Sequence, residues 1–371
     1  MKILVTANYY PEKVGGIEIV AENLVSRFRR AGHEVRWLAA DVRDRKRVPR
    51  PGDYPIKAWN FTETRLGFPY PIPHPAGLTA TREHVDWADV IHIHDCLYLH
   101  NQYLFWQAKR RRKPVILTQH IGIALYPQRY KGLLQKVAYH SIGKAILRKS
   151  DQVVFVSDTV KWWFQTFVDF RAEPEVIPNG VDLDIFRDEK RAEIRGDRVT
   201  PSLLFVGRFT QNKGLPLIRE VAAARPEWAW TLVGPPGEID PDAWCLDNVR
   251  VLPACAQSEL GALYRSADLL VLPSAREGFP LVVAEAMGCG TPVLIGPETA
   301  LALAGLKDCV AVSELTNSQL QRTIEAILSD RNRSAKLSEV GRNFAARYLN
   351  WDTASDSYLQ LFESILAGRS I

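Results

Sequence analysis

The sequence predicts an α/β protein built from two Rossmann-like domains, each a doubly wound, mostly parallel sheet. The chain has 371 residues, more than one typical core accommodates, so two domains are expected. Short apolar runs alternate with segments of helical periodicity, which is typical of parallel sheets with crossover helices. This alternation pauses once, at IPNGVDLDIF and the charged run after it, and then resumes. We therefore expect domains of residues 1–180 and 181–351, with a last helix of about 352–371 packing back on the first.

In the first domain, buried strands are expected wherever a short apolar run ends in polar or glycine-containing sequence. These runs are Ile3–Thr6, Val35–Ala39, Ile56–Trp59, Val90–His94, Val115–Thr118 and Val153–Val156. Helical periodicity predicts helices at Ile17–Arg30, Leu97–Arg112, Arg129–Lys149 and Asp158–Phe167. The segment Phe68–Pro75 is interpreted as an ordered loop because it is rich in aromatic residues.

The second domain repeats the alternation. Strands are expected at Ser202–Val206, Ala229–Val233, Val249–Leu252, Leu269–Leu272 and Pro292–Ile295. Helices are expected at Leu215–Ala224 and Ser258–Ser266, from Pro280 onward, and through the tail Ser318–Gly368, where Trp351 separates two helices. With both sets of strands doubly wound, their carboxyl ends should face one ligand cleft between the domains.

Composition limits the possible classes of protein. The chain is 46% hydrophobic and 24% charged, as in soluble globular proteins. Its net charge of +5 permits an anionic ligand or membrane surface, and no nucleic-acid-binding motif accompanies it. Five scattered cysteines without CxxC spacing argue against a disulfide framework and a structural zinc site. The start, MKILVTANYYP, is interpreted as a buried strand, and no apolar run is long enough to span a membrane. We expect a cytoplasmic protein that can rest on the inner face of the membrane.

The segment SAREGFPLVVAEAMGCGTPVL carries the strongest signal. Glu277 lies just ahead of a helix that Pro280 can open as its first residue, and Glu285 lies within that helix. The helix mouth offers backbone N–H groups to an anion, while carboxylates accept hydrogen bonds from hydroxyl groups. These N–H groups belong to Gly278, Phe279 and Leu281. The pattern favours a ligand that is both anionic and rich in hydroxyls, such as a nucleoside diphosphate sugar. An ordinary surface glutamate before an amphipathic helix is the alternative.

Two glycine-containing loops could receive the anionic part of such a ligand. In GRFTQNKG, Arg208 and Lys213 leave a strand end together and could hold a diphosphate; a solvated basic loop is the alternative. In NYYPEKVGGIE, Gly15 and Gly16 precede a helix and allow close approach of a bulky anion, unless they form only a flexible turn. The GxGxxG spacing of a dinucleotide site is absent.

Histidines lie near two predicted strand ends and are candidate functional groups. His120 ends a strand in TQHIGIALYP, where polar groups usually have a function. The alternative is a hydrogen-bonded loop histidine, which is the more common case for a single histidine. His92 and His94 alternate with isoleucines and should share one face of a strand. No third ligand with convincing spacing accompanies them, so we assign them to packing and loop structure and expect no metal.

The predicted helix Arg129–Lys149 mixes apolar and basic residues. Its pattern fits a helix lying in the surface of an anionic membrane, and it fits an ordinary surface helix with one buried face. The apolar residues are Leu133, Leu134, Val137, Ile142, Ile146 and Leu147. The basic residues are Arg129, Lys131, Lys136, Lys144, Arg148 and Lys149.

Taken in order, PEKVGGIE, TQHIG, GRFTQNKG and EGFPLVVAE resemble the retaining family 4 glycosyltransferases of GT-B fold. The resemblance runs over nearly the whole chain, with IPNGVDLDIF at the crossing between domains, and its most specific element is the Glu–x7–Glu pattern. It implies an N-terminal acceptor-binding domain and a C-terminal domain that binds the nucleotide-sugar donor across a cleft.

The same resemblance implies roles at matched positions. Arg208 and Lys213 would hold the donor diphosphate, Glu277 the transferred sugar, and Glu285 the ribose, while His120 would contact a sugar hydroxyl near the reacting carbon. The loop of Gly15 and Gly16 would approach the distal phosphate through the Gly16 N–H. The amides around Pro280 (Gly278, Phe279 and Leu281) would surround sugar and phosphate, and backbone near Pro253 and Ala254 would contact the base. We thus expect catalytic roles for Glu277, His120, Arg208 and Lys213.

The implied reaction is a retaining, front-face transfer that needs no metal and no cofactor beyond a nucleotide-sugar co-substrate, UDP- or GDP-linked. The acceptor would be a glycan or lipid-linked glycan of bacterial surface polysaccharide, lipopolysaccharide or glycolipid synthesis, near Tyr9, Tyr10, Ile121 and Tyr126. A small soluble acceptor, or a GT-B epimerase or phosphorylase, is the alternative. Two departures stand out: Pro253 replaces a glycine common in relatives, and GPETALALAG lacks their glycine pair.

Overall fold

The computed structural model describes residues 1–11, 16–41, 50–66, 70–122, 129–189 and 200–368. The chain forms two compact units. The first comprises Met1–Ile177 and Trp351–Ile371, and the second comprises Pro178–Asn350. The backbone therefore passes from one unit to the other twice, once on each side of the second unit.

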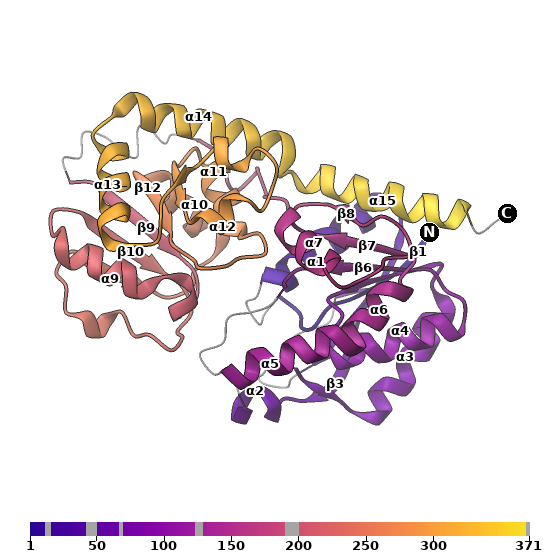
Figure 1. Ribbon diagram of the computed structural model, residues 1–371. Helices are drawn as coiled ribbons and strands as arrows, with labels where there is room; N and C mark the ends of the chain where they lie inside the picture. Colours follow the sequence, from indigo (N-terminus) through magenta and orange to yellow (C-terminus); the bar gives the residue numbers. More distant parts are fainter. Residues whose placement is uncertain (12–15, 42–49, 67–69, 123–128, 190–199, 369–371) are drawn as a thin grey trace. The chain divides into compact units, whose positions relative to one another are not determined.

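The first unit contains an eight-stranded sheet in the order β4-β3-β2-β1-β5-β6-β7-β8. Figure 1 labels β1, β3, β6, β7 and β8 of this sheet. Its strands are β1 (Lys2–Thr6), β2 (Glu34–Asp41), β3 (Asp53–Trp59), β4 (Ile72–Pro73), β5 (Val90–His94), β6 (Val115–Gln119), β7 (Gln152–Phe155) and β8 (Glu175–Val176). Every pair is parallel except β3–β4, which is antiparallel. The six predicted strands are confirmed. Strand β4 corrects the expectation that this segment is only a loop.

Helices flank this sheet. They are α1 (Gly16–Arg30), α2 (Phe61–Leu66), α3 (Pro75–Trp87), α4 (Leu99–Arg110), α5 (Arg129–Ala138), α6 (Lys144–Lys149), α7 (Asp158–Gln165) and α15 (Trp351–Ala367). The predicted helix Arg129–Lys149 is confirmed as α5 and α6, joined without a break by the π-helical turn η1 (Tyr139–Gly143). Helix α4 begins two residues later than predicted because its N-cap, Tyr98, has extended dihedral angles.

The last helix packs on the first unit, along α1 (Figure 1). Phe362 of α15 makes an edge contact with Phe28 of α1, with ring centroids 5.5 Å apart. At the start of α15, Asp352 accepts a hydrogen bond from Arg27 Nε at 2.7 Å. The C-terminal segment thus completes the apolar core on this face of the sheet.

The second unit contains a six-stranded parallel sheet in the order β11-β10-β9-β12-β13-β14. Its strands are β9 (Ser202–Val206), β10 (Ala229–Val233), β11 (Val249–Leu252), β12 (Leu269–Leu272), β13 (Val293–Ile295) and β14 (Ala311–Val312). Its α-helices are α9 (Leu215–Ala224), α10 (Gln257–Ser266), α11 (Leu281–Gly288), α12 (Pro297–Ala300), α13 (Asn317–Leu328) and α14 (Arg331–Tyr348). Short 3₁₀ turns are η2 (Gln211–Lys213), η3 (Asp242–Trp244) and η4 (Leu306–Asp308). The predicted tail is helical, and Trp351 is the first residue of α15.

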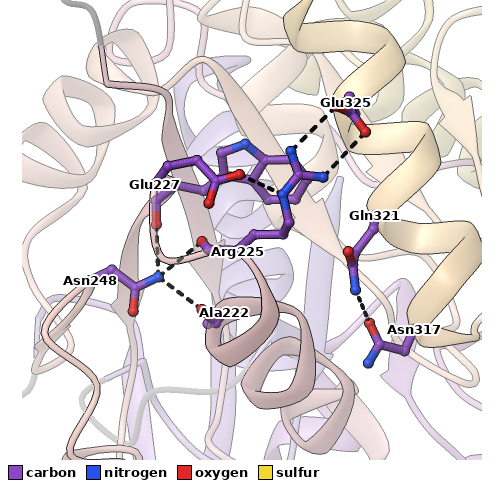
Figure 2. A network of polar contacts seen from close by, with 8 residues as sticks. Ala222, Arg225, Glu227, Asn248, Asn317, Gln321 and Glu325 are labelled. Carbon is purple, nitrogen blue, oxygen red and sulfur yellow. Dashed lines mark hydrogen bonds and ion pairs between the residues drawn. The ribbon is translucent and has the colours of Figure 1, made fainter.

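A polar network fixes the end of α9 in this unit (Figure 2). Asn248 Nδ2 donates to the carbonyl oxygens of Ala222, Arg225 and Trp228. The Arg225 guanidinium pairs with Glu227 and with Glu325 of α13. Exposed ion pairs of this kind are screened by solvent and contribute little to stability. The Asn248 amide, which satisfies three carbonyls at once, is therefore the firmer link between α9 and the strands that follow it.

Both sheets reverse their strand order beside a central strand. In the first unit the chain leaves β1 toward β2 and later returns to β5 on the other side; in the second unit β9, β10 and β12 repeat this pattern. Open α/β sheets bind ligands at such switch points, outside the carboxyl ends of the strands. The loops after β1 and β5, and those after β9 and β12, are therefore the places where a site is expected.

Candidate active site

Two loops of the second unit meet at the switch point of its sheet. Gly214, which follows β9, has φ of +80° and ends the turn η2. A Cβ atom on Gly214 would lie 2.2 Å from the carbonyl oxygen of Pro273, which follows β12. Only glycine allows this approach. The Ala275 N–H also donates to the Asn212 carbonyl at 3.1 Å, so the two loops are fixed against each other.

This contact brings together two predicted site residues that are far apart in the sequence. Lys213 Nζ donates to Glu277 Oε1 and forms an ion pair with it. Their side chains are 29% and 12% exposed, so the pair is sheltered but reachable. An anionic ligand could take the place of Glu277 at the ammonium group. The released carboxylate could then accept hydrogen bonds from hydroxyl groups of the same ligand.

Arg208 leaves the same strand as Lys213, two residues after β9 ends. Its side chain is exposed, and it forms no ion pair with any carboxylate in the described part of the chain. A second cation at this edge is thus available to an anion that approaches Lys213. Because guanidinium groups bind phosphates through two parallel hydrogen bonds, Arg208 suits a diphosphate.

The start of α11 differs by one position from the prediction. Pro280 is the N-cap, with φ −76° and ψ 120°, and the helix begins at Leu281. Gly278 and Phe279 therefore precede the helix and are not part of its first turn. Phe279 and Pro280 are buried and anchor the loop, whereas Gly278 and Leu281 are partly exposed. The Leu281 N–H remains at the positive end of the helix dipole.

Glu285 lies within α11 and is buried, with 8% of its surface exposed. It accepts a hydrogen bond of 2.8 Å from the hydroxyl of Tyr264, a fully buried residue of α10. Burial raises the pKa of Glu285 to about 7, although the Tyr264 hydroxyl opposes the rise. Tyr264, which no sequence pattern marked, orients the carboxylate of Glu285, the residue predicted to contact the ribose.

Glu285 should make folding stability depend on pH. Its folded-state pKa is raised, so its contribution is fully present below the ordinary value of 4.5 and is lost as the pH rises through about 7. A shift of this size corresponds to about 3 kcal/mol. We expect the free energy of unfolding of the wild type to fall by about that amount relative to E285Q between pH 5 and pH 8. Urea denaturation at several pH values measures it, and parallel curves for the two proteins would contradict the assignment.

The predicted base-contact residues follow β11 at the same edge of the second sheet. Pro253 and Ala254 are both exposed. The strand end before them is held by Gly234, whose N–H donates to the Leu252 carbonyl at 3.1 Å. Their backbone is therefore accessible at the edge where Lys213 and Glu277 lie.

In the first unit, His120 directly follows β6 and is 4% exposed. Its Nε2 lies 2.9 Å from Nδ1 of His94, at the end of β5. Burial lowers the pKa of His120 to about 3, so the imidazole is neutral near pH 7. With Nε2 occupied by His94, Nδ1 is the nitrogen through which His120 can contact a ligand. A neutral imidazole suits a hydrogen bond to a sugar hydroxyl.

His94 belongs to a row of buried rings. The His94 ring lies 4.3 Å from that of His92 and 5.2 Å from that of His120. His92 Nε2 is 2.8 Å from the Thr118 hydroxyl, which is 2.9 Å from the Tyr358 hydroxyl of α15. The prediction that His92 and His94 share a face is confirmed. Assigning His94 to packing alone was incomplete, because it positions His120.

A second polar cluster beside it was missed from the sequence. Asp95 follows β5 with φ of 71° and is buried, and burial raises its pKa to about 6. Gln119 Nε2 donates to Asp95 Oδ2 at 3.0 Å and to the Ile121 carbonyl at 2.8 Å. These bonds fix the loop that carries His120 and Ile121. An aspartate at a strand terminus was the available signal.

The other predicted site residues of the first unit differ in their exposure to solvent. Tyr9 and Tyr10 are buried; Tyr9 donates to Asn60 Oδ1 at 3.3 Å and Tyr10 to the Trp37 carbonyl at 3.1 Å. Gly16 is exposed at the start of α1, and a Cβ there would meet nothing within 4 Å. Gly15 and Tyr126 lie outside the described residues.

Helix α5 does not have the buried apolar face that one of the two interpretations of this basic segment requires. Its large apolar side chains point outward: Tyr130, Leu133, Leu134 and Val137 are 55–64% exposed, whereas Gln135 is buried. The expectation of an apolar buried face is therefore wrong for α5, although Ile146 and Leu147 of α6 are buried as expected. No helix in the described part of the chain is both long and apolar enough to cross a bilayer.

The sequence is similar to those of known glycosyltransferases along most of its length. Residues 14–185 match the family model "Glycosyltransferase Family 4", and residues 186–344 match "Glycosyl transferases group 1". A D-inositol 3-phosphate glycosyltransferase of Thermobispora bispora is 30% identical over 318 residues, covering 75% of this chain and 71% of that protein. One of Segniliparus rotundus is 32% identical over 54% of this chain, and the match spans only half of that relative's length.

Solved structures show the same fold over the full chain. Sucrose-phosphate synthase from Thermosynechococcus elongatus superimposes with a TM-score of 0.79 at 22% identity, over 99% of this chain and 100% of that one. HepE of Anabaena in complex with UDP-glucose gives 0.73 at 17% identity, over 98% and 100%. The chain thus has the fold of two-domain glycosyltransferases.

Proposed function

Because the chain belongs to glycosyltransferase family 4, we propose that it moves a sugar from a nucleoside diphosphate sugar to an acceptor hydroxyl with retention of configuration. The observation that carries this proposal is the Lys213–Glu277 pair at the switch point of the second sheet. It combines a cation for a diphosphate with an acceptor for sugar hydroxyls, and Arg208 adds a second cation. That a structural relative was solved with UDP-glucose supports a UDP-linked donor, with a GDP-linked donor as the alternative.

The proposed step is a front-face displacement. The acceptor oxygen forms a bond to the anomeric carbon while the bond from that carbon to the diphosphate oxygen breaks. The electron pair of the broken bond goes to the diphosphate, which takes the proton of the acceptor hydroxyl. Arg208 and Lys213 would stabilise the charge that develops on the leaving group, so the proposal requires no metal and no enzymatic base. Attack and departure on one face retain the configuration.

The remaining predicted residues would orient the substrates. Glu277 would accept from hydroxyls of the transferred sugar, Glu285 from the ribose, and backbone at Pro253 and Ala254 would contact the base. Neutral His120 would bond to a sugar hydroxyl, with its ring held by His94. Holding two substrates in reactive geometry is itself a large part of the rate enhancement.

We propose a membrane-linked glycan of cell-surface polysaccharide, lipopolysaccharide or glycolipid synthesis as the acceptor. The exposed apolar face of α5 supports this proposal. The second candidate is a small soluble polyol, favoured by relatives named D-inositol 3-phosphate glycosyltransferase. The two differ in whether transfer depends on a lipid surface.

The proposed membrane contact predicts binding to anionic vesicles. Wild-type protein should sediment with phosphatidylglycerol-containing vesicles at low salt and be released by high salt. The double variant L133D/V137D should lose at least about tenfold in binding, since burial of each apolar side chain contributes about 1.5–3 kcal/mol. Trp162→Asp on α7, where Trp162 is 68% exposed, is the matched control and should bind normally. Equal sedimentation of all three proteins would contradict the proposed contact of α5 with the membrane.

A thermal-shift screen of UDP-, GDP-, ADP- and TDP-sugars tests the donor proposal. A ligand that binds only the folded protein raises its melting temperature, so the matching donor should stand out. The identified donor is then incubated alone and with phosphate. Scrambling of the sugar without an acceptor would indicate an epimerase, and dependence on inorganic phosphate would indicate a phosphorylase. No shift with any of these nucleotide sugars would overturn the proposal.

A further inference from the structure

A cavity of about 390 Å³ lies in the first unit, beside α5. Its walls come from three parts of the chain: α2 and β4, then α4, and then the continuous helix of α5 and η1. The apolar residues of the lining are Ile72, Leu97, Leu99, Leu134, Ala138 and Ile142. The volume is within the range of small-molecule sites. The cavity belongs to the first unit, and none of its lining residues is among the proposed donor-binding residues of the second unit.

The lining argues against a carbohydrate as occupant. Among the residues that the structure describes, no charged side chain lines the cavity. The Thr62 hydroxyl already donates to the Tyr70 carbonyl at 2.6 Å, and Gln102 Nε2 to the carbonyls of Cys96 and Leu97 at 3.3 and 3.0 Å. These two donors are committed to the backbone, and Tyr70 and Gln135, the other polar residues of the lining, have partners as well. A sugar placed here would therefore lose hydrogen bonds to water with little replacement. A hydrocarbon chain requires none.

The surroundings indicate what such a chain would be attached to. Leu134 lines the cavity and is 57% exposed, next to the outward-facing Leu133 and Val137, so the cavity adjoins the apolar face of α5. The helical rod continues into α6 (Figure 1), where Lys144, Arg148 and Lys149 line a surface hollow. None of these three cations pairs with a carboxylate among the described residues. Lys149 lies over the ring of Trp106, with its Nζ 4.9 Å from the ring centroid. An apolar chain beside cations that no carboxylate neutralises matches an amphiphile with an anionic head group.

The cavity also lies at the edge of the sheet where His120 is found. Leu97 follows β5 by three residues, and His120 directly follows β6, its parallel neighbour. Leu97 of the cavity lining and the loop that begins at His120 therefore lie at the same edge of the first sheet.

We propose that this cavity binds the hydrocarbon chain of an acceptor whose head group carries a phosphate. The inference rests on the proposed function and deepens it, because it makes the acceptor a lipid phosphate that is held by its chain within the first unit. The chain would supply binding energy remote from the reacting hydroxyl.

Alkyl phosphates of four to twelve carbons test the proposal by calorimetry on the full chain, below their aggregation concentrations. Dodecyl phosphate should bind saturably with one molecule per protein, and butyl phosphate should not bind measurably. Affinity should rise about fourfold per added methylene until the cavity is filled. Absence of dodecyl phosphate binding, or affinity independent of chain length, would overturn the proposal. Binding to anionic vesicles without binding of the monomeric alkyl phosphate would overturn it too.

Two tryptophan substitutions on neighbouring positions separate the cavity from the outer face. Ala138→Trp fills the cavity and should lower dodecyl phosphate affinity at least tenfold, whereas Val137→Trp, on the exposed face, should leave it unchanged. Ile142→Trp serves if the Ala138 variant does not fold. Equal affinity of the cavity-filling and exposed-face variants would contradict the assignment. Nucleotide-sugar binding is measured on the same proteins. If the wild type binds no nucleotide sugar, the proposed function is overturned. If it binds a nucleotide sugar but no alkyl phosphate, only this inference is overturned.

Discussion

Replacing Lys213 by alanine should lower turnover by about 10²–10³-fold, the range found when one preorganised electrostatic contact to a developing charge is removed. The backbone that carries Lys213 is fixed because Gly214 packs on the Pro273 carbonyl and Asn212 accepts from Ala275. A cation held in this way does not need to reorganise as the diphosphate gains charge. The measurement is kcat with the donor found by thermal shift, together with the Kd of its nucleoside diphosphate by calorimetry.

Two further variants test whether the effect of Lys213→Ala comes from the charge and position of this residue. Lys213→Arg keeps the charge but changes its geometry, and should restore diphosphate binding more fully than turnover. Lys307→Ala removes an exposed lysine of η4 in the same unit and should behave as wild type. An unchanged Kd for the nucleoside diphosphate in the Lys213→Ala variant would remove this residue from the diphosphate site.

Most of the architecture was predictable because strands buried on both faces are continuous apolar runs. Every strand of four or more residues was expected from such a run. The two-residue strands β4, β8 and β14 were not, since so short a pairing leaves no periodicity. Helix α3 was also missed: in the segment PAGLTATREHVDW only Thr81 and Val85 are buried, so its apolar stripe is weak.

The site was predictable to the extent that it depends on topology. Lys213 and Glu277 follow β9 and β12, neighbouring parallel strands whose carboxyl ends lie at one edge, so their proximity follows from the strand order. Tyr264 and His94 could not be found in this way. Their roles come from the packing of one element on another, which brings Tyr264 to Glu285 and His94 to His120.

Helix α5 shows a limit of pattern-based reasoning. Its sequence has an apolar stripe, and a stripe normally marks the buried face. In the structure, Leu133 and Leu134 of α5 are exposed, whereas Gln135 of the same helix is buried. Periodicity identifies the existence of a face, and only tertiary contacts determine which face is covered.

Replacing Glu277 by alanine should lower kcat by about 10²-fold, the scale of loss when a reacting group is misplaced by about 1 Å. The same change should leave the affinity for the nucleoside diphosphate unchanged or increase it. In the free protein Glu277 holds Lys213 in an ion pair, and a diphosphate must break that pair to reach the ammonium. Without the carboxylate, Lys213 is available from the start. The variant should therefore bind the leaving group well and transfer the sugar poorly.

Glu285→Ala supplies the contrast, because a ribose contact is present equally in the ground and transition states. Removing it should raise KM with a smaller effect on kcat. Glu277→Gln keeps the shape of the side chain without its charge, and distinguishes a hydrogen-bond acceptor, which would retain part of the activity, from a required negative charge. Steady-state kinetics on the three variants, each checked for a cooperative thermal transition, decide the matter. If Glu277→Ala and Glu285→Ala lose the same activity together with their folded structure, both glutamates are structural and the proposed division of roles between them fails.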